Sequence, residues 1–308
     1  MTGIHVNRRT LLFSAVGLAA YGVTGRLWAA DAALDSYKVN DRIQVITGAG
    51  GNVVVYKGDG GVTLIDTGAP DRSADVLKMV DTLTGKAPIR TVFNSHWHDD
   101  HTGGNEAMHA RGARIIAHIN TKLWLGADFD VYWRNTTHKP RPKAALPDET
   151  FYTGGKLDLG GETLEYAHLP QAHTDGDIYL YFRQSNVMAL GAFMTNKQYP
   201  IADIATGGWL GGLVAANKAI LAMIDDNTVL IPSRGPALKK SDLKAQYDML
   251  SDVYDTMKKM MQDGYSGNDM LKEKITAKYD AVWGMPDTFI LETYRGMAAH
   301  TYDMGGFI

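Results

Sequence analysis

The chain has 308 residues, of which 45% are hydrophobic, and it carries a formal net charge of -3 and no cysteine. This length and apolar content suffice for a single soluble α/β domain with a sizeable core. The lack of cysteine excludes disulfides, cysteine ligands to a metal and a cysteine nucleophile, and it is compatible with an oxidising compartment. The charges are dispersed rather than gathered into basic runs, so they give no electrostatic case for a nucleic-acid substrate.

The N-terminus has the features of an export signal. Arg8 and Arg9 precede an apolar stretch, Leu11 to Ala20, as in twin-arginine signals, and this stretch is too short to span a membrane comfortably. Small residues follow at Ala29, Ala30, Ala32 and Ala33, where a peptidase can cut. We predict that residues 1–32 are a removed twin-arginine signal peptide, that residues 33–308 form the mature domain, and that this domain is periplasmic and not bound to a membrane. A retained N-terminal anchor or a disordered basic leader is the alternative.

Short β-prone runs at 43–47, 53–57 and 62–66, separated by glycine-rich turns, predict strands. Residues 73–84 have apolar side chains on roughly one helical face and predict a helix, which a strand at 89–94 follows. A second set of strands is expected at 156–159, 163–168, 178–182, 187–190 and 228–231, with helices outside both sheets. Periodicity alone supports a mixed α/β fold.

Three histidines and two aspartates fall within the six residues 96–101, directly after the strand at 89–94. Residues two apart at a strand end point the same way, so His96 and His98 can share one ion, while Asp100 and His101 face a neighbouring position. Neutral imidazole and carboxylate are suitable ligands for zinc. A solvated polar turn, the alternative, would have Gly, Asn or Ser here, so we predict a metal site.

The order His-x-His-x-Asp-His followed by Thr-Gly-Gly-Asn resembles the metallo-β-lactamase superfamily, and the resemblance spans roughly residues 41–236. It implies a four-layer αββα sandwich, with Asp66 supporting the metal ligands from behind. It also implies that His173, in Ala-His-Thr-Asp-Gly-Asp, completes a three-nitrogen set with His96 and His98. One position would stay open for water, as in catalytic zinc sites, where the pKa of the bound water can approach about 7.

Two positions depart from the family pattern of members that bind two metals. Ala192 stands where a bridging aspartate is expected, and Arg234 stands where a late histidine is expected. Asp100 and His101 then remain for a second ion, and two protein ligands are too few to hold zinc tightly. We therefore predict one tightly bound zinc ion, with a second weak or absent.

Arg234 suggests a further role, because a guanidinium at this position suits an anionic substrate group or a developing oxyanion. Alternatively, Arg234 turns outward to solvent or pairs with a surface acid. A competing hypothesis is that His300, at the end of a helix-like run, folds back to replace the missing ligand.

Three other segments invite predictions. Between Gly126 and Thr153 lies a long segment with little regular pattern, in which Tyr132, Trp133 and Arg134 are candidates either for substrate contact or for surface packing. The glycine-rich run 206–212 lacks a phosphate-loop pattern, which favours close helix packing over anion binding. Residues 241–263 and 268–300 are helical in pattern, and their methionines are expected to fill a core.

The leading hypothesis is a periplasmic zinc hydrolase in which metal-bound hydroxide attacks the carbonyl of an amide, lactam, lactone or ester of a small molecule. The predicted metal ligands are His96, His98, Asp100, His101 and His173, and Asp100 and Arg234 are the predicted catalytic residues. Asp100 would orient the water or accept its proton. The main alternative is a binding or regulatory protein that keeps the fold without turnover. A redox di-iron protein is disfavoured because Ala192 replaces the bridging carboxylate.

Overall fold

A computed structural model describes residues 33–303 of the chain. The strands are β1 Asp35–Lys38, β2 Ile43–Thr47, β3 Val53–Gly58, β4 Gly61–Ile65, β5 Ile89–Phe93, β6 Arg114–His118, β7 Phe129–Val131, β8 Thr136–His138, β9 Glu149–Phe151, β10 Gly154–Asp158, β11 Thr163–His168, β12 Ile178–Phe182, β13 Val187–Ala189 and β14 Val229–Ile231. The α-helices are α1 Ser73–Thr84, α2 Asp99–Thr102, α3 Asn105–Ala110, α4 Ile119–Leu125, α5 Leu210–Met223, α6 Lys240–Gln262, α7 Gly267–Lys272, α8 Ala277–Trp283 and α9 Asp287–Asp303. Short 3-10 helices are η1 Pro70–Arg72, η2 Tyr132–Arg134, η3 Lys143–Ala145, η4 Gly191–Phe193 and η5 Ile204–Thr206.

The strands form two main sheets. The first has the order β1-β2-β3-β4-β5-β6-β9, with antiparallel pairing from β1 to β4 and parallel pairing from β4 to β9. The second has the order β10-β11-β12-β13-β14, antiparallel except for the last pair. Strands β7 and β8 form a separate two-stranded sheet.

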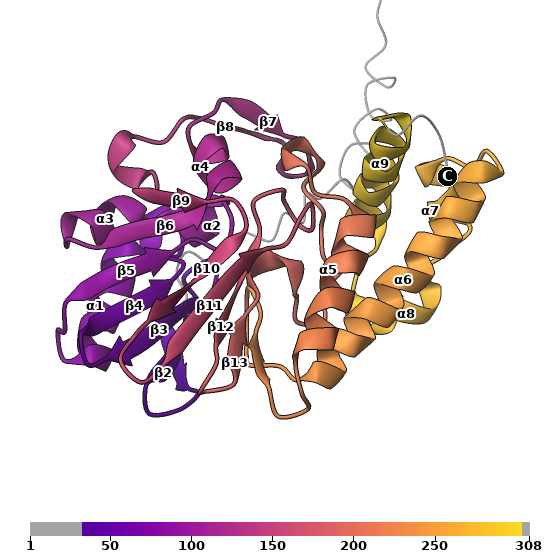
Figure 1. The fold of residues 1–308 in the computed structure, drawn as a ribbon. Helices are drawn as coiled ribbons and strands as arrows, with labels where there is room; N and C mark the ends of the chain where they lie inside the picture. The colour runs from indigo at the N-terminus through magenta and orange to yellow at the C-terminus, as the bar shows by residue number, and fades with distance from the viewer. Residues whose placement is uncertain (1–32, 304–308) are drawn as a thin grey trace, which may run out of the picture. The chain divides into compact units, whose positions relative to one another are not determined.

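Side chains along each strand point alternately to the two faces of its sheet. One face of each sheet packs against the other sheet, and helices cover the outer faces. Val54 packs between the sheets, whereas Val53 and Val55 pack with residues of α1 on the outer face of the first sheet. On the second sheet, Leu180 packs inward and Tyr181 packs outward with residues of α5 and α6. A strand with both faces buried must be apolar at successive positions, as these runs are. Figure 1 shows the resulting four layers, so the predicted αββα sandwich with C-terminal helices is confirmed.

Most predicted elements agree with the structure within one or two residues, and the helix at 73–84 agrees at both ends. Strands β1, β6, β7, β8 and β9 were not predicted. The segment 126–153 is more regular than expected, because it contains β7, η2, β8, η3 and β9. The methionines of the C-terminal helices were expected in a core, and Met249, Met257, Met270 and Met297 are indeed buried there.

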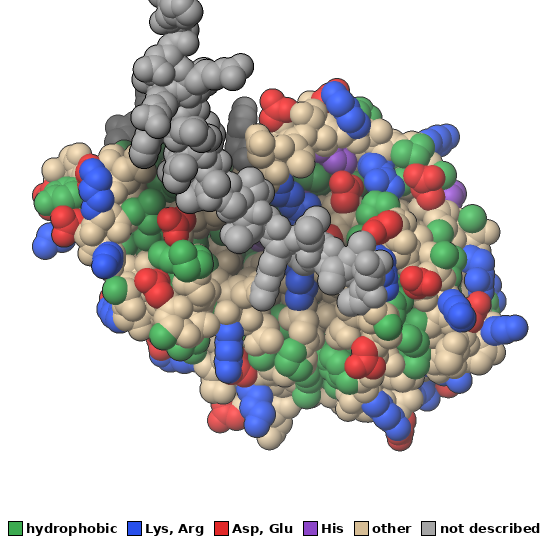
Figure 2. All heavy atoms as spheres, turned by 180° about the vertical axis from the view of Figure 1, so that it is seen from behind, with side chains coloured by type: hydrophobic (Ala, Val, Ile, Leu, Met, Phe, Trp, Pro, Cys, Tyr) green, Lys and Arg blue, Asp and Glu red, His purple; other side chains and the backbone are tan. Residues whose placement is uncertain are grey.

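The surface is mixed in charge. On the face in Figure 2, the Lys and Arg side chains are interspersed with Asp and Glu. Within residues 33–303, no helix has the length and apolar character needed to cross a bilayer. The predicted signal peptide lies outside the described residues, so that assignment stays a prediction.

Candidate metal centre

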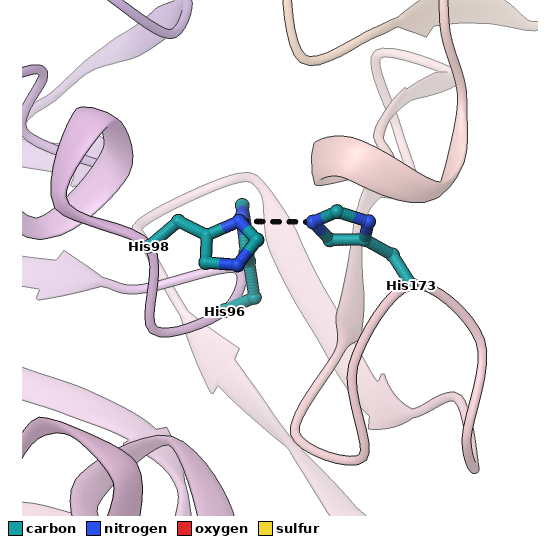
Figure 3. A group of neighbouring side chains, drawn as sticks. All are labelled: His96, His98 and His173. Atoms are coloured by element: carbon teal, nitrogen blue, oxygen red, sulfur yellow. Dashed lines mark hydrogen bonds between the residues drawn. The ribbon is translucent and has the colours of Figure 1, made fainter. Parts of the chain in front are cut away.

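The three histidines assigned to the first metal lie in loops at the ends of both sheets. His96 and His98 follow β5 of the first sheet, and His173 lies between β11 and β12 of the second. All three are buried, and one ring nitrogen from each lies within 4.8 Å of the others. Figure 3 shows His96 and His98 on one side and His173 facing them. The structure therefore brings together the three histidines that the family resemblance assigned to the first metal.

Hydrogen bonds behind His98 and His173 fix which ring nitrogen carries the proton. His98 Nε2 lies 2.9 Å from Asp203 Oδ2, and His173 Nδ1 lies 2.5 Å from the Ile201 carbonyl oxygen. A carboxylate and a carbonyl only accept, so these nitrogens donate. The other nitrogens, His98 Nδ1 and His173 Nε2, then present lone pairs to each other at 3.0 Å. Two facing lone pairs repel unless a cation lies between them, which is what a metal site supplies.

The same logic applies to His96. Ser95 Oγ donates to Asp66 Oδ2 at 2.7 Å, so it accepts from His96 Nδ1, 3.0 Å away. His96 Nε2 is buried and has no hydrogen-bond partner among the described residues. Three lone pairs, each fixed by an acceptor on the far side of its ring, thus converge. This donor set fits a metal ion such as zinc, whose histidine ligands are typically held in this way.

The electrostatic surroundings keep these imidazoles neutral, as metal ligands must be. Burial, together with repulsion from the neighbouring histidines, holds the pKa of His96 well below its usual value. Burial and the nearby Arg134 do the same for the pKa of His98. Burial lowers the pKa of His173 to about 4.

Asp66 lies behind the site, where the family resemblance placed it. Its carboxylate accepts from the Ser95 backbone N–H at 2.7 Å and from His101 Nδ1 at 2.6 Å, in addition to Ser95 Oγ. Its φ of 63° is left-handed, a conformation that Asp tolerates better than most residues. The backbone at Asp66 is thus turned so that one carboxylate orients His101 directly and His96 through Ser95.

Two further aspartates position the histidines, and the sequence analysis gave neither a role. Asp203 is fully buried; its side chain holds His98, and its backbone N–H donates to the His173 carbonyl at 2.7 Å. Asp177 accepts from the His173 backbone N–H at 2.5 Å and from Thr174, and burial raises the pKa of Asp177 to about 7. One sequence feature could have pointed to Asp203: it is a single acidic residue inside the apolar run Pro200-Ile201-Ala202-Asp203-Ile204.

Asp100 lies between two arginines. Its Oδ1 accepts from Arg134 Nη2 at 3.0 Å, and its Oδ2 accepts from Arg234 Nη2. Arg234 also donates through Nε to the Gly50 carbonyl at 2.6 Å. Burial alone would raise the pKa of Asp100, but the charges of His101, Arg134 and Arg234 outweigh it and hold this pKa well below its usual range. Arg234 therefore points to the predicted site rather than to solvent, and Asp100 is engaged on both oxygens.

Two of the candidates from the segment 126–153, Trp133 and Arg134, lie beside the histidines. Trp133 packs against His98 with ring centroids 5.7 Å apart, and the Arg134 guanidinium lies 4.5 Å from the Trp133 ring centre, so this segment covers the site. Gly208 packs closely, as the glycine-rich run predicted, because a Cβ there would lie 2.1 Å from the His173 carbonyl.

The hypothesis that His300 replaces a metal ligand is wrong for this structure. His300 stacks on Trp209, with ring centroids 3.7 Å apart and planes 15° apart. Helix α9 packs against α5 and η5, which fixes the side chain at this aromatic contact. The group of described residues that could hold a metal contains His96, His98 and His173, without His300.

Comparison with known proteins agrees with the fold. Residues 46–219, more than half of the chain, match the metallo-beta-lactamase superfamily, and the chain belongs to this superfamily. A hydroxyacylglutathione hydrolase from Nitrosococcus oceani is 31% identical over 146 residues, 47% of this chain and 48% of that protein. The chain thus spans about half the length of this curated relative.

Solved structures share the fold at low sequence identity. A metallo-beta-lactamase from Pontibacter korlensis is 22% identical with a TM-score of 0.59, covering 71% of this chain and 99% of that one. A sec-alkylsulfatase from Pseudomonas sp. is 19% identical with a TM-score of 0.63, covering 85% of this chain and 50% of that one. At these identities the likeness shows the fold alone.

Proposed function

We propose that the protein is a metal-dependent hydrolase that uses a single zinc ion to cleave an amide, lactam, lactone or ester of a small molecule. The observation that carries the proposal is the convergence of three buried lone pairs, on His96 Nε2, His98 Nδ1 and His173 Nε2. The names of relatives support hydrolysis, since they include a hydroxyacylglutathione hydrolase and a metallo-beta-lactamase.

When bound, zinc supplies Lewis-acid activation of a water molecule and of the carbonyl that the water attacks. The chain supplies the rest. Asp203, Ser95 and the Ile201 carbonyl hold the three rings so that their lone pairs keep one geometry. Because both oxygens of Asp100 are engaged by arginines, we assign it to orientation within the site rather than to proton transfer.

A single tightly held ion is favoured over two by the surroundings of Asp100. The guanidinium of Arg234 lies against the carboxylate that a second ion would need, and Ala192 offers no ligand atom. His101 Nε2 has no hydrogen-bond partner among the described residues, but one histidine is too little on its own to hold zinc tightly. We further propose a periplasmic location, supported by the paired arginines and the absence of cysteine.

The test is metal content per chain of the purified protein, combined with hydrolysis of a small panel of a β-lactam, a lactone and an ester before and after chelation. We expect one zinc per chain and turnover that chelation abolishes and zinc restores. Two tightly bound ions would contradict the single-metal site. A protein that holds zinc yet turns over none of these classes would favour the alternative, a binding or regulatory protein with Ala192 and Arg234 in place of ligands.

A further inference from the structure

A cleft of about 320 Å³ lies at the end of the sandwich away from the metal centre. Strands β3, β4 and β5 of the first sheet line one side, and residues 157–160, the end of β10 and the turn after it, line the other. Phe93, which packs between the sheets, lies on β5 between Thr91 in the cleft and His96. Small-molecule sites have volumes from about 300 to 1,000 Å³, so this cleft is large enough for a small ligand.

A row of three hydroxyl groups forms one wall of the cleft. Tyr56 pairs with Thr63 across β3 and β4, and Thr63 pairs with Thr91 across β4 and β5. All three residues line the cleft, although they are only 0%, 3% and 6% exposed. They face the second sheet, because Ile65 and Phe93, two residues further along β4 and β5, pack between the sheets.

The two threonine hydroxyls have no hydrogen-bond partner. Neither Thr63 Oγ1 nor Thr91 Oγ1 forms a hydrogen bond within the part of the chain that the structure describes. By contrast, the buried Thr84 hydroxyl donates to the Val80 carbonyl oxygen at 2.7 Å. A buried hydroxyl without a partner lowers the free energy of unfolding. A ligand in the cleft would supply the missing partner for both threonines.

An irregularity in β5 turns Thr91 into the cleft. Val62 pairs with Ile89 and the next residue, Thr63, pairs with Thr91, so Arg90 is an extra residue in β5. In a regular strand Ile89 and Thr91 would lie on the same face. Here Ile89 packs on the outer face of the sheet and Thr91 faces inward. Bulges of this kind often redirect a side chain at a functional position.

The rest of the cleft is apolar inside and balanced in charge at its rim. Leu157 and Leu159 line the side of the second sheet. Arg90 and Asp158 also line the cleft, and Arg90 Nε donates to the Gly60 carbonyl oxygen at 3.3 Å. One cation and one acid leave no excess charge, so the rim favours neither an anion nor a cation.

A second ion pair at the rim keeps this balance. Arg42 donates to Tyr56 Oη at 3.4 Å and lies 3.3 Å from Asp59 Oδ1. Tyr56 Oη accepts in that bond and keeps its own proton free to donate. The cleft therefore offers hydrogen-bonding groups, apolar surface and no net charge.

We propose that this cleft is a second binding site, for a small uncharged molecule with an apolar, ring-sized body and a hydroxyl group, as in a phenol. The ligand hydroxyl forms hydrogen bonds with Thr63 and Thr91, and the ring packs against Leu157 and Leu159. The site is separate from the three histidines, so its existence does not depend on the proposed hydrolysis.

The first experiment is calorimetric titration of the purified protein with 4-ethylphenol. We expect one molecule per chain with a Kd below about 1 mM, and a Kd at least about 3-fold higher for ethylbenzene, which lacks only the hydroxyl. Tyramine and 3-(4-hydroxyphenyl)propanoate add a positive and a negative charge to the same phenol. Neither should bind more tightly than 4-ethylphenol, because the rim carries no excess charge.

Thr63→Val and Thr91→Val remove one hydroxyl each with little change in shape. Each should raise the Kd of 4-ethylphenol about 3- to 10-fold, and neither should lower Tm, because the hydroxyl has no protein partner to lose. Thr84→Val is the matched control, since Thr84 is a buried threonine with a hydrogen bond. That control should lower Tm and leave the Kd within about twofold.

Several results would overturn the proposal. They are the absence of binding, equal affinity for ethylbenzene, tighter binding of either charged phenol, or an unchanged Kd in both threonine variants. The comparison of ligands uses the unchanged protein, so it decides even if a threonine variant fails to fold. The titration is repeated after chelation and in His173→Ala, where the Kd should stay within about twofold. Loss of binding there would place the phenol at the metal centre and would also overturn the proposal.

Discussion

Asp203 holds two of the three candidate metal ligands at once, so its replacement tests how the site is built. The carboxylate accepts from His98 Nε2 at 2.9 Å, and the backbone N–H donates to the His173 carbonyl. Asp203→Ala keeps the backbone bond and removes the side-chain bond. His98 then loses the acceptor that fixes its ring orientation, and its Nε2–H is left buried without a hydrogen-bond acceptor.

The expected size of the effect follows from the role of such partners. Loss of a hydrogen-bond partner behind a metal ligand weakens metal affinity about 10- to 100-fold, which corresponds to about 1.4–2.7 kcal/mol. The unsatisfied His98 N–H should also lower the free energy of unfolding by about 1–3 kcal/mol. Asp203→Asn keeps a neutral acceptor, and neutral hydrogen bonds are about half as strong as charged ones, so the loss of metal affinity should be about 3- to 10-fold.

The assay is competition for zinc with a chromophoric chelator, with urea unfolding of the metal-free proteins in parallel. Asp226→Ala serves as the control, because the Asp226 side chain is 94% exposed and far less constrained. If folded Asp203→Ala binds zinc as tightly as the unchanged protein, the proposed orientation of His98 by Asp203 is refuted. If Asp203→Asn is as impaired as Asp203→Ala, then charge rather than hydrogen bonding carries the effect.

Three further predictions concern the second cation position, the packing behind the site and the response to acid. The double variant Ala192→Asp with Arg234→His restores two ligands of the family pattern, so the zinc content should rise from one to two ions per chain. Elemental analysis measures this content, and an unchanged value would show that another feature blocks the second ion. Gly208→Ala puts a methyl group 2.1 Å from a backbone carbonyl and should cost more than about 2 kcal/mol in urea unfolding, whereas Gly60→Ala, with open space around it, should change stability by less than about 0.5 kcal/mol. Burial lowers the pKa of His118 to about 4 from an ordinary 6.5, so the unfolded chain binds the proton more readily, and the free energy of unfolding should fall as the pH drops from about 6.5 to 4. His118→Gln should make the free energy of unfolding, measured with urea at pH 7, 5.5 and 4.5, depend less on pH. If the variant shows the same dependence as the unchanged protein, the assignment to His118 is refuted.

The parts of the fold that the sequence predicted are those whose pattern is local. Helix α1 has a clear apolar face, and strands β2, β11 and β12 are compact β-prone runs between turns. Strand β1, Asp35–Lys38, is a polar strand at the edge of the sheet, and its pairing with β2 has no signature in its own residues. The period of two at the end of β5 was enough to align His96 with His98, whereas His173 required the family pattern.

The contacts that complete the site join residues far apart in the chain, which is why local patterns did not reveal them. Asp203 meets His98 across 105 positions, and Arg234 meets Asp100 across 134. Arg234 was identified by its place in the family pattern, but its pairing with a buried acid, and the second arginine at Arg134, depend on how the segments fold together. The error on His300 has the same cause. Histidine is a common metal ligand, but the sequence did not reveal that His300 stacks on Trp209.

The guanidinium of Arg234 against Asp100 has a consequence for how the protein depends on its surroundings. A metal ion at such a position dissociates and exchanges, and its occupancy follows the concentration of free metal outside the protein. An arginine is attached through the backbone and keeps its charge across the physiological pH range. The positive charge at this position is therefore part of the polypeptide itself, and it does not change when metal is scarce.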